Sequence, residues 1–167
     1  ACQPTSVPKS EPEQAVERKQ AIPALTVKLL GQWNGWRVPL GEQCSKDGGN
    51  GATPPLRVSN IPEDASELYV FFDDIDEPSL SQNGGLGVVA YEVIAADMIL
   101  PPLPAMTKNV GSGARVVKKA RTTGPYASDG YLPPCSGAQG HRYVASIVAM
   151  ADSGDQLAIG RVPLGKY

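Results

Sequence analysis

The sequence contains a single histidine, His141, and few aromatic residues, which make up 6% of the 167 residues. It also has no basic run interleaved with aromatic residues, and its 15 Lys and Arg are balanced by 17 Asp and Glu. This composition lacks the positive surface that nucleic-acid-binding proteins use. No apolar run approaches the ~20 residues that a transmembrane helix requires. We therefore expect neither a nucleic-acid partner nor a membrane-spanning segment.

Motifs for catalysis and metal binding are also missing. One histidine and no close pair of cysteines argue against a zinc site. There is no G-x-S-x-G motif, and Gly-Ser-Gly at 111–113 lacks the strand, turn and helix that surround a nucleophilic serine. A Cys135 thiolate with His141 as its base is conceivable, but the loop between them implies no fixed geometry. We expect a protein that is not an enzyme and has no cofactor and no metal.

Glycine and proline are abundant, with 18 and 16 residues in a chain whose length suits one domain. This predicts short strands joined by loops, and no helix of normal length after residue 23. Positive side chains predict that 114–120 forms a strand at the edge of a sheet. Apolar residues on both faces predict that 142–151 forms a strand in the centre of a sheet. The fold class is therefore all-β, a β-sandwich or a partly closed barrel. The expected strands are 24–30, 35–39, 56–60, 66–74, 87–97, 114–120, 142–151 and 157–167.

Residues 1–23 differ from the β domain expected at 24–167. They are rich in proline and polar residues, which is typical of a flexible tether with at most one short helix capped by Ser10. Ala1-Cys2-Gln3 resembles the cleavage region of a bacterial lipoprotein signal peptide. This predicts a lipid on Cys2 as the only membrane attachment of a cell-envelope protein that faces the periplasm or is exported. In the alternative interpretation the sequence merely begins here and Cys2 has no role.

Residues 130–143, GYLPPCSGAQGHRY, contain most of the groups suited to chemistry. Prolines and glycines predict an ordered loop that leads into the strand at 142–151. Side chains two residues apart share one face of a strand, so His141 and Tyr143 are expected to point the same way at its mouth. A polar pair at the end of a buried strand, under such a loop, predicts a pocket.

A second polar group, Asp73, Asp74, Asp76 and Glu77, ends the strand expected at 66–74. These carboxylates are oxygen ligands that suit Ca²⁺, although their spacing does not match an EF-hand. Alternatively, one of them contacts His141 and stabilises a charged imidazole as a hydrogen-bond donor. The third interpretation is a solvated acidic turn.

Cys44 and Cys135 both lie in glycine-rich loops. In an exported protein they are expected to form a disulfide, which in the chain-entropy model stabilises the fold by up to ~4 to 5 kcal/mol. This pairing would also remove Cys135 as a nucleophile. The competing interpretation is two buried free thiols.

Three segments, in order, resemble motifs of the phosphatidylethanolamine-binding protein family, which includes Raf kinase inhibitor protein and bacterial homologues. They are CSKDGGNGATPPLRVSNIPEDA (44–65), ELYVFFDDIDEP (67–78) and the 130–143 stretch, and the resemblance covers about residues 24–167. The family implies an antiparallel β-sandwich with few or no core helices and a small pocket for phosphate-type anions. The motif positions imply five ligand-binding residues: Asp74, Asp76, Pro78, His141 and Tyr143.

The sequence also departs from the family pattern. Val88 and Val89 stand where the family has a second pocket histidine and a neighbouring tryptophan. Loss of this histidine as a charge-assisted donor should weaken anion binding by about 1.5 to 3 kcal/mol. Ser136 and Gly137 replace prolines, which predicts a looser loop. The family has a helix before the last strand that partly walls the pocket, whereas this sequence has only residues 151–156 there. This difference predicts a more open pocket.

The function expected from these features is that of a non-catalytic binding module, an envelope lipoprotein with a degenerate pocket for a small anionic ligand such as a phosphate or phospholipid headgroup. The alternative, favoured by Val88 and Val89, is a scaffold lipoprotein in which the pocket is a relic. Its partner would be another envelope protein, or an enzyme that it inhibits.

Overall fold

A computed structural model describes residues 22–167, and almost all of their regular structure is strand. Its helical elements are three single turns of 3-10 helix, η1 (Ser45–Asp47), η2 (Pro78–Leu80) and η3 (Gly124–Tyr126). No helix in these residues is long and apolar enough to cross a membrane. The strands are β1 (Thr26–Leu29), β2 (Leu56–Ser59), β3 (Ala65–Asp74), β4 (Val88–Glu92), β5 (Met98–Leu100), β6 (Ala114–Lys118), β7 (Arg142–Ala151) and β8 (Gln156–Lys166).

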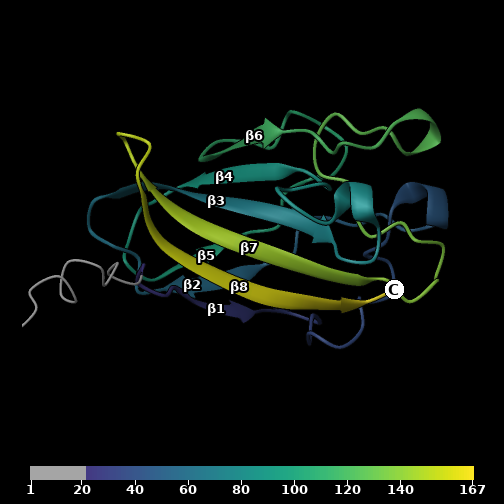
Figure 1. Ribbon diagram of the computed structural model, residues 1–167, viewed down its shortest axis with the longest axis horizontal. Helices are drawn as coiled ribbons and strands as arrows, with labels where there is room; N and C mark the ends of the chain where they lie inside the picture. Colours follow the sequence, from purple (N-terminus) through teal and green to yellow (C-terminus); the bar gives the residue numbers. More distant parts are fainter. Residues whose placement is uncertain (1–21) are drawn as a thin grey trace, which may run out of the picture.

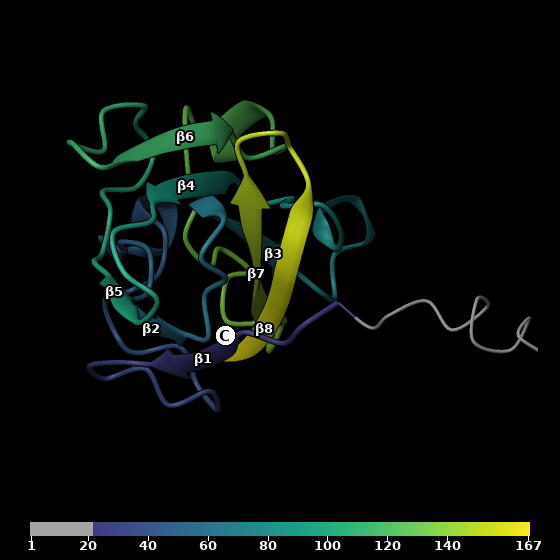
Figure 2. The ribbon, with the colours of Figure 1, turned by 90° about the vertical axis from the view of Figure 1, so that its left-hand side faces the viewer.

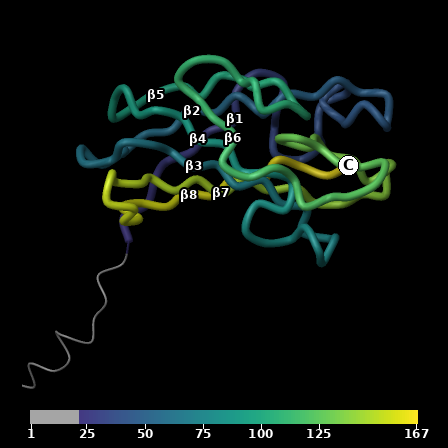
Figure 3. Tube along the Cα trace, turned by 90° about the horizontal axis from the view of Figure 1, so that it is seen from above, coloured from purple at the N-terminus to yellow at the C-terminus, as the bar shows by residue number. Residues whose placement is uncertain are grey.

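The strands form two antiparallel sheets that pack face to face (Figures 1 and 2). The smaller sheet has the order β1-β2-β5 and the larger has the order β6-β4-β3-β7-β8. Figure 3 shows the smaller sheet in one layer and β3, β7 and β8 in the other. This arrangement confirms the predicted all-β sandwich with few or no core helices.

The core lies between the sheets and follows from the period of two along each strand. On β3, Leu68, Val70 and Phe72 are buried, whereas the residues between them are partly exposed. They pack in one hydrophobic cluster with Val58 of β2 and Ile147 of β7. Burial of these apolar side chains stabilises the sandwich by roughly 1.5 to 3 kcal/mol for each residue.

Pairing of β3 with β7 positions the polar strand ends. Their register is antiparallel and places Asp74 opposite Tyr143, so the last residues of β3 lie beside the first residues of β7. Since β7 also pairs with β8, it is the central strand that its sequence predicts. The predicted edge strand is also confirmed, because β6 pairs with β4 alone.

Two predicted strands are wrong in part. Residues 35–39 form only an isolated bridge, between Arg37 and Lys166, because Asn34 Oδ1 accepts hydrogen bonds from the backbone N–H groups of Trp36 and Arg37 and holds a turn. The strand predicted at 87–97 ends at Glu92, and after a bend the chain joins the other sheet as β5. Cys2 and the short helix predicted after Ser10 lie outside the described residues.

Candidate functional site

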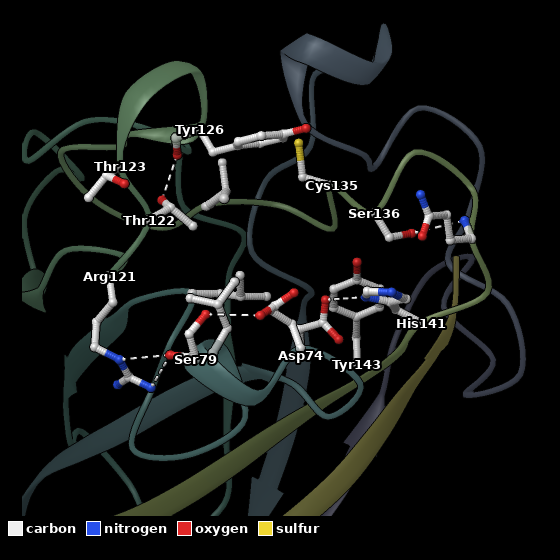
Figure 4. A pocket seen from close by; sticks show the side chains of 15 residues that line it. Asp74, Ser79, Arg121, Thr122, Thr123, Tyr126, Cys135, Ser136, His141 and Tyr143 are labelled. Carbon is white, nitrogen blue, oxygen red and sulfur yellow. Dashed lines mark hydrogen bonds and ion pairs between the residues drawn. The ribbon is translucent and has the colours of Figure 1, made fainter.

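A pocket of about 520 Å³ lies at the end of the larger sheet where β3 ends and β7 begins (Figure 4). Its wall is built from four parts of the chain: the acidic end of β3 with η2, Leu86, the segment from Arg121 to Tyr126, and the loop that leads into β7. Asp74, His141 and Tyr143, which lie far apart in the sequence, all line it. Its size is typical of small-molecule sites.

The centre of the pocket is a hydrogen bond between Asp74 and His141. Asp74 Oδ2 lies 2.7 Å from His141 Nδ1, and Asp74 Oδ1 accepts the backbone N–H of Asp76 at 3.0 Å. An ionised carboxylate only accepts hydrogen bonds, so Nδ1 carries the proton. Both carboxylate oxygens of the buried Asp74 are thus occupied, and within residues 22–167 nothing bonds to His141 Nε2.

Tyr143 contributes a second polar group. Its hydroxyl is buried and has no hydrogen-bond partner among the described residues. Burial raises the pKa of this hydroxyl, which therefore keeps its proton at neutral pH. An unpaired buried hydroxyl costs about 1 to 3 kcal/mol, which a ligand oxygen or an ordered water would offset. The hydroxyl of Tyr131 is also buried and unpaired, but Tyr131 does not line the pocket.

Asp76 and Pro78, the other two residues implied by the motif, do not line the pocket. Asp76 accepts two hydrogen bonds from the Arg142 guanidinium, at 2.8 and 3.1 Å, and one from the Arg142 backbone N–H at 2.7 Å. Pro78 begins η2, whose Ser79 and Leu80 do line the pocket. These two motif residues therefore shape the site from outside.

The acidic strand end has two buried carboxylates, Asp73 and Asp74, and an exposed one, Asp76, in the turn that follows. The buried Asp73 accepts the backbone N–H groups of Gly84 and Gly85, each at 2.9 Å, and Asp74 and Asp76 have the partners described above. Within residues 22–167 the one group of three side chains close enough to share a metal ion is Cys44, Asp47 and Cys135. Its two sulfurs are joined in a disulfide, so these cysteines are not thiolate ligands.

The ion pair of Asp76 with Arg142 gives a pH prediction. Hydrogen bonds from the guanidinium and the backbone N–H of Arg142 lower the pKa of the Asp76 carboxyl from 3.8 to about 2. Because the folded value is the lower one, the pair's contribution to stability is present in full above about pH 4 and is lost as the pH falls toward 2. An NMR titration of the Asp76 carboxyl should give a midpoint near 2, and Arg142→Ala should return it toward 3.8. An unchanged midpoint in the variant would contradict this assignment.

The predicted disulfide between Cys44 and Cys135 is confirmed, with 5.3 Å between the Cα atoms. The alternative of two free thiols is therefore wrong, and Cys135 has no thiol with which to act as a nucleophile. Around the disulfide, the backbone N–H of Gly137 donates to Asp47 at 2.9 Å, and the Ser136 hydroxyl donates to the C-terminal residue Tyr167. The loop that was expected to be loose is thus held at several points.

Sequence reasoning missed one wall of the pocket, which consists of Arg121, Thr122, Thr123 and Tyr126. These residues follow the edge strand in a polar turn, and no family motif includes them. An arginine before a Thr-Thr-Gly-Pro turn was the only signal in the sequence.

The turn at 152–155 stands where the family pattern has a helix. It joins β7 to β8 at the end of the sheet away from the pocket (Figure 1). Its shortness therefore does not open this pocket.

Val88, which stands at the position of the second pocket histidine, is fully buried at the start of β4 and is not part of the pocket wall. No imidazole faces the pocket from that strand, and the sequence has no other histidine to supply one. His141 is therefore the one imidazole in this pocket.

Comparison with known proteins agrees with the fold and the motifs. The chain is 32% identical over 108 residues to a UPF0098 protein of Chlamydia muridarum and 31% identical to one of Chlamydia trachomatis. In both cases the match covers 64% of this chain and 63% of the relative, so the chain spans less than two thirds of either relative's length.

Two solved structures share the fold. One is a phosphatidylethanolamine-binding protein homologue from Chlamydia trachomatis, with a TM-score of 0.53 and 21% identity. The other is YbcL of Escherichia coli, described as a new member of the mammalian family, with a TM-score of 0.55 and 19% identity. Each comparison covers 86% of this chain and 97% of the other. Because the sequence model of the phosphatidylethanolamine-binding protein family matches residues 15–163, the chain belongs to that family.

Proposed function

We propose that the protein is a non-catalytic binding module whose pocket takes a small phosphate-type anion. The observation that carries this proposal is the pairing of Asp74 with His141 beside the unpaired hydroxyl of Tyr143. Both oxygens of Asp74 already accept hydrogen bonds from the protein. What remains for a ligand at this end of the pocket is a set of donors, His141 Nε2 in its protonated form and the Tyr143 hydroxyl.

The shape of the pocket agrees with a substituted phosphate. A volume of about 520 Å³ exceeds what a bare phosphate fills, and hydroxyl groups of Thr122, Thr123 and Ser136 line its other walls. The Thr122 and Ser136 hydroxyls already donate to the backbone oxygens of Tyr126 and Tyr167, so they can accept hydrogen bonds from a headgroup attached to the phosphate, and Thr123 can accept or donate one. A single imidazole donor gives modest affinity, since each charge-assisted hydrogen bond contributes about 1.5 to 3 kcal/mol.

The pocket proposal is tested by NMR titration of the protein with O-phosphoethanolamine. We expect shifts of the amide signals of His141, Tyr143 and the loop from Cys135 to Gly140 at millimolar ligand, because these groups surround the free donors. A spectrum without shifts in these residues at that concentration would contradict the anion pocket and favour a scaffold role in which the pocket is a relic.

The second part of the proposal is that the protein is an envelope lipoprotein attached to the membrane through Cys2. It is supported by the residues Ala1-Cys2-Gln3, which resemble a lipoprotein cleavage region, and by the Cys44–Cys135 disulfide, which suits an oxidising compartment. Mass spectrometry of the protein extracted from bacterial envelopes should find two or three acyl chains on Cys2. An unmodified Cys2 would refute the anchor without affecting the pocket.

A further inference from the structure

Two large apolar side chains stand out from the loop between β1 and η1. Trp36 is 83% exposed and Leu40, in the same loop, is 98% exposed. Neither belongs to the core or to the wall of the pocket at His141. Apolar area left in water at two nearby positions gives a favourable free energy to a partner that buries it. This loop is therefore a candidate binding surface.

The backbone of this loop is fixed where it carries Trp36. Asn34 Oδ1 accepts the backbone N–H groups of Trp36 and Arg37, at 2.9 and 3.2 Å. The loop is also joined to the end of β8, because the Lys166 N–H donates to the Trp36 carbonyl and the Val38 N–H donates to the Lys166 carbonyl, each at 3.0 Å. A binding residue on a backbone that is already ordered loses less conformational entropy when it meets its partner.

An open hollow of about 650 Å³ lies beside Trp36, between β1 and β8. The residues that line it are mainly apolar and include Leu29, Trp33, Val162 and Pro163. Apolar surface therefore extends from Trp36 onto the edge of the sandwich. The hydrophobic effect is non-directional, so an open apolar surface suits a flexible group such as a lipid acyl chain.

Three cations surround this apolar surface, and none has a carboxylate partner within residues 22–167. Arg37 and Lys166 are exposed and face each other in an isolated backbone bridge, and Lys28 is exposed in the wall of the hollow. By contrast, three other arginines each form an ion pair with a carboxylate: Arg57, Arg115 and Arg142. Like charges at paired positions repel each other, so an anionic partner would relieve the repulsion between Arg37 and Lys166.

We propose that Lys28, Trp36, Arg37, Leu40 and Lys166, which we call the Trp36 surface, bind a membrane that contains anionic lipids. An indole ring has an apolar body and a polar N–H, which suits it to the interface between headgroups and acyl chains. Cations beside such a residue are attracted to anionic headgroups. The whole chain has a net charge of −2, so this attraction comes from the local surface and not from the chain as a whole.

This inference is independent of the pocket, and it adds a second contact to the membrane attachment expected at Cys2 alone. Ala24 bridges Ile159 near the start of β8, and the Trp36 surface lies at the other end of that strand. These two points on β8 are about 23 Å apart at ~3.3 Å per residue. A chain of the length between Cys2 and Ile22 spans up to ~70 Å when fully extended. A lipid on Cys2 therefore leaves the Trp36 surface free to lie on the same membrane.

The inference is tested by cosedimentation of the full chain with vesicles. The protein carries Cys2→Ser, so that no lipid on Cys2 contributes to binding. We expect it to partition onto phosphatidylcholine vesicles that contain phosphatidylglycerol and not onto vesicles of phosphatidylcholine alone. Binding should weaken as the salt concentration rises, because salt screens the attraction to the headgroups. Tryptophan emission should shift to shorter wavelength on binding, since Trp36 leaves water.

Trp36→Ala and Leu40→Ala should each lower the partition coefficient for the anionic vesicles roughly fivefold, because each removes apolar area that the membrane buries. Arg37→Gln and Lys166→Gln should each lower it about fivefold as well, which is the contribution of one cation near an anionic surface. All four side chains are exposed, so the variants should keep the thermal unfolding midpoint of the parent protein.

Two matched controls change the same kinds of residue elsewhere on the molecule. Lys118→Gln removes one exposed cation from β6, which lies at the edge of the larger sheet opposite β8 (Figure 1). Ile94→Ala removes an apolar side chain in the segment after β4, where Ile94 is 78% exposed. Both variants should partition like the parent protein.

Three results would overturn the inference: no binding to the anionic vesicles, equal binding to vesicles of phosphatidylcholine alone, or a loss in Lys118→Gln as large as in Arg37→Gln. Sedimentation velocity tests another occupant, a second copy of this chain. A dimer that Trp36→Ala dissociates, in a protein that does not bind the vesicles, would overturn the inference and assign the surface to contact between copies. The pocket at His141 is unaffected by these outcomes, because no residue of the Trp36 surface lines it.

Discussion

Replacing Cys44 and Cys135 by alanine should lower the free energy of unfolding by about 4 kcal/mol. The two cysteines are 91 residues apart, and in the chain-entropy model a cross-link that closes a loop of this length stabilises by ~4 to 5 kcal/mol. The bond also joins the loop around η1 to the loop that carries His141. Since small domains are stable by only about 5 to 15 kcal/mol in total, this is a large share.

Urea denaturation followed by circular dichroism measures the effect, in a Cys2→Ser background that leaves a single pair of cysteines. Reduction of the unsubstituted pair should reproduce the loss, which separates the cross-link from the packing of the side chains. A decrease below about 1 kcal/mol in both experiments would show that the disulfide contributes little to the stability of the fold.

His141→Ala should weaken the binding of O-phosphoethanolamine at least tenfold. The substitution removes the imidazole donor of the pocket, and a hydrogen bond to a charged group contributes about 1.5 to 3 kcal/mol. It also leaves Asp74, whose side chain is 6% exposed, without its partner. An unpaired carboxylate in that position repels an anion, which adds to the loss.

The affinity is measured by calorimetry at fixed ionic strength, and Arg142→Ala is the control because Arg142 precedes Tyr143 on the same strand but points to Asp76. The control should lose less than threefold. Equal losses in the two variants would indicate a general electrostatic attraction and not a site at His141.

The strands of the core could be predicted because their information is local. On β3, alternating apolar residues predict which side chains face the other sheet, and the structure buries Leu68, Val70 and Phe72 as expected. The same pattern does not show where a chain changes sheet, which is why 87–97 was predicted as one long strand although β4 ends at Glu92 and the chain joins the other sheet at Met98. The turn at 35–39 was missed because the side chain of Asn34, which directly precedes this segment, accepts hydrogen bonds from its backbone N–H groups and competes with strand pairing.

The sequence by itself determined the all-β class, the two long strands β3 and β7, and the presence of a polar loop with His141, Tyr143 and Cys135. Only the tertiary structure decided which acid contacts His141, because Asp73, Asp74 and Asp76 are neighbours in sequence but face different partners. It also brought Arg121 into the pocket, across a distance in sequence that no motif spans. The physical reason is that residue type and spacing fix local conformation, whereas contacts between distant segments depend on sheet register and on how loops are held.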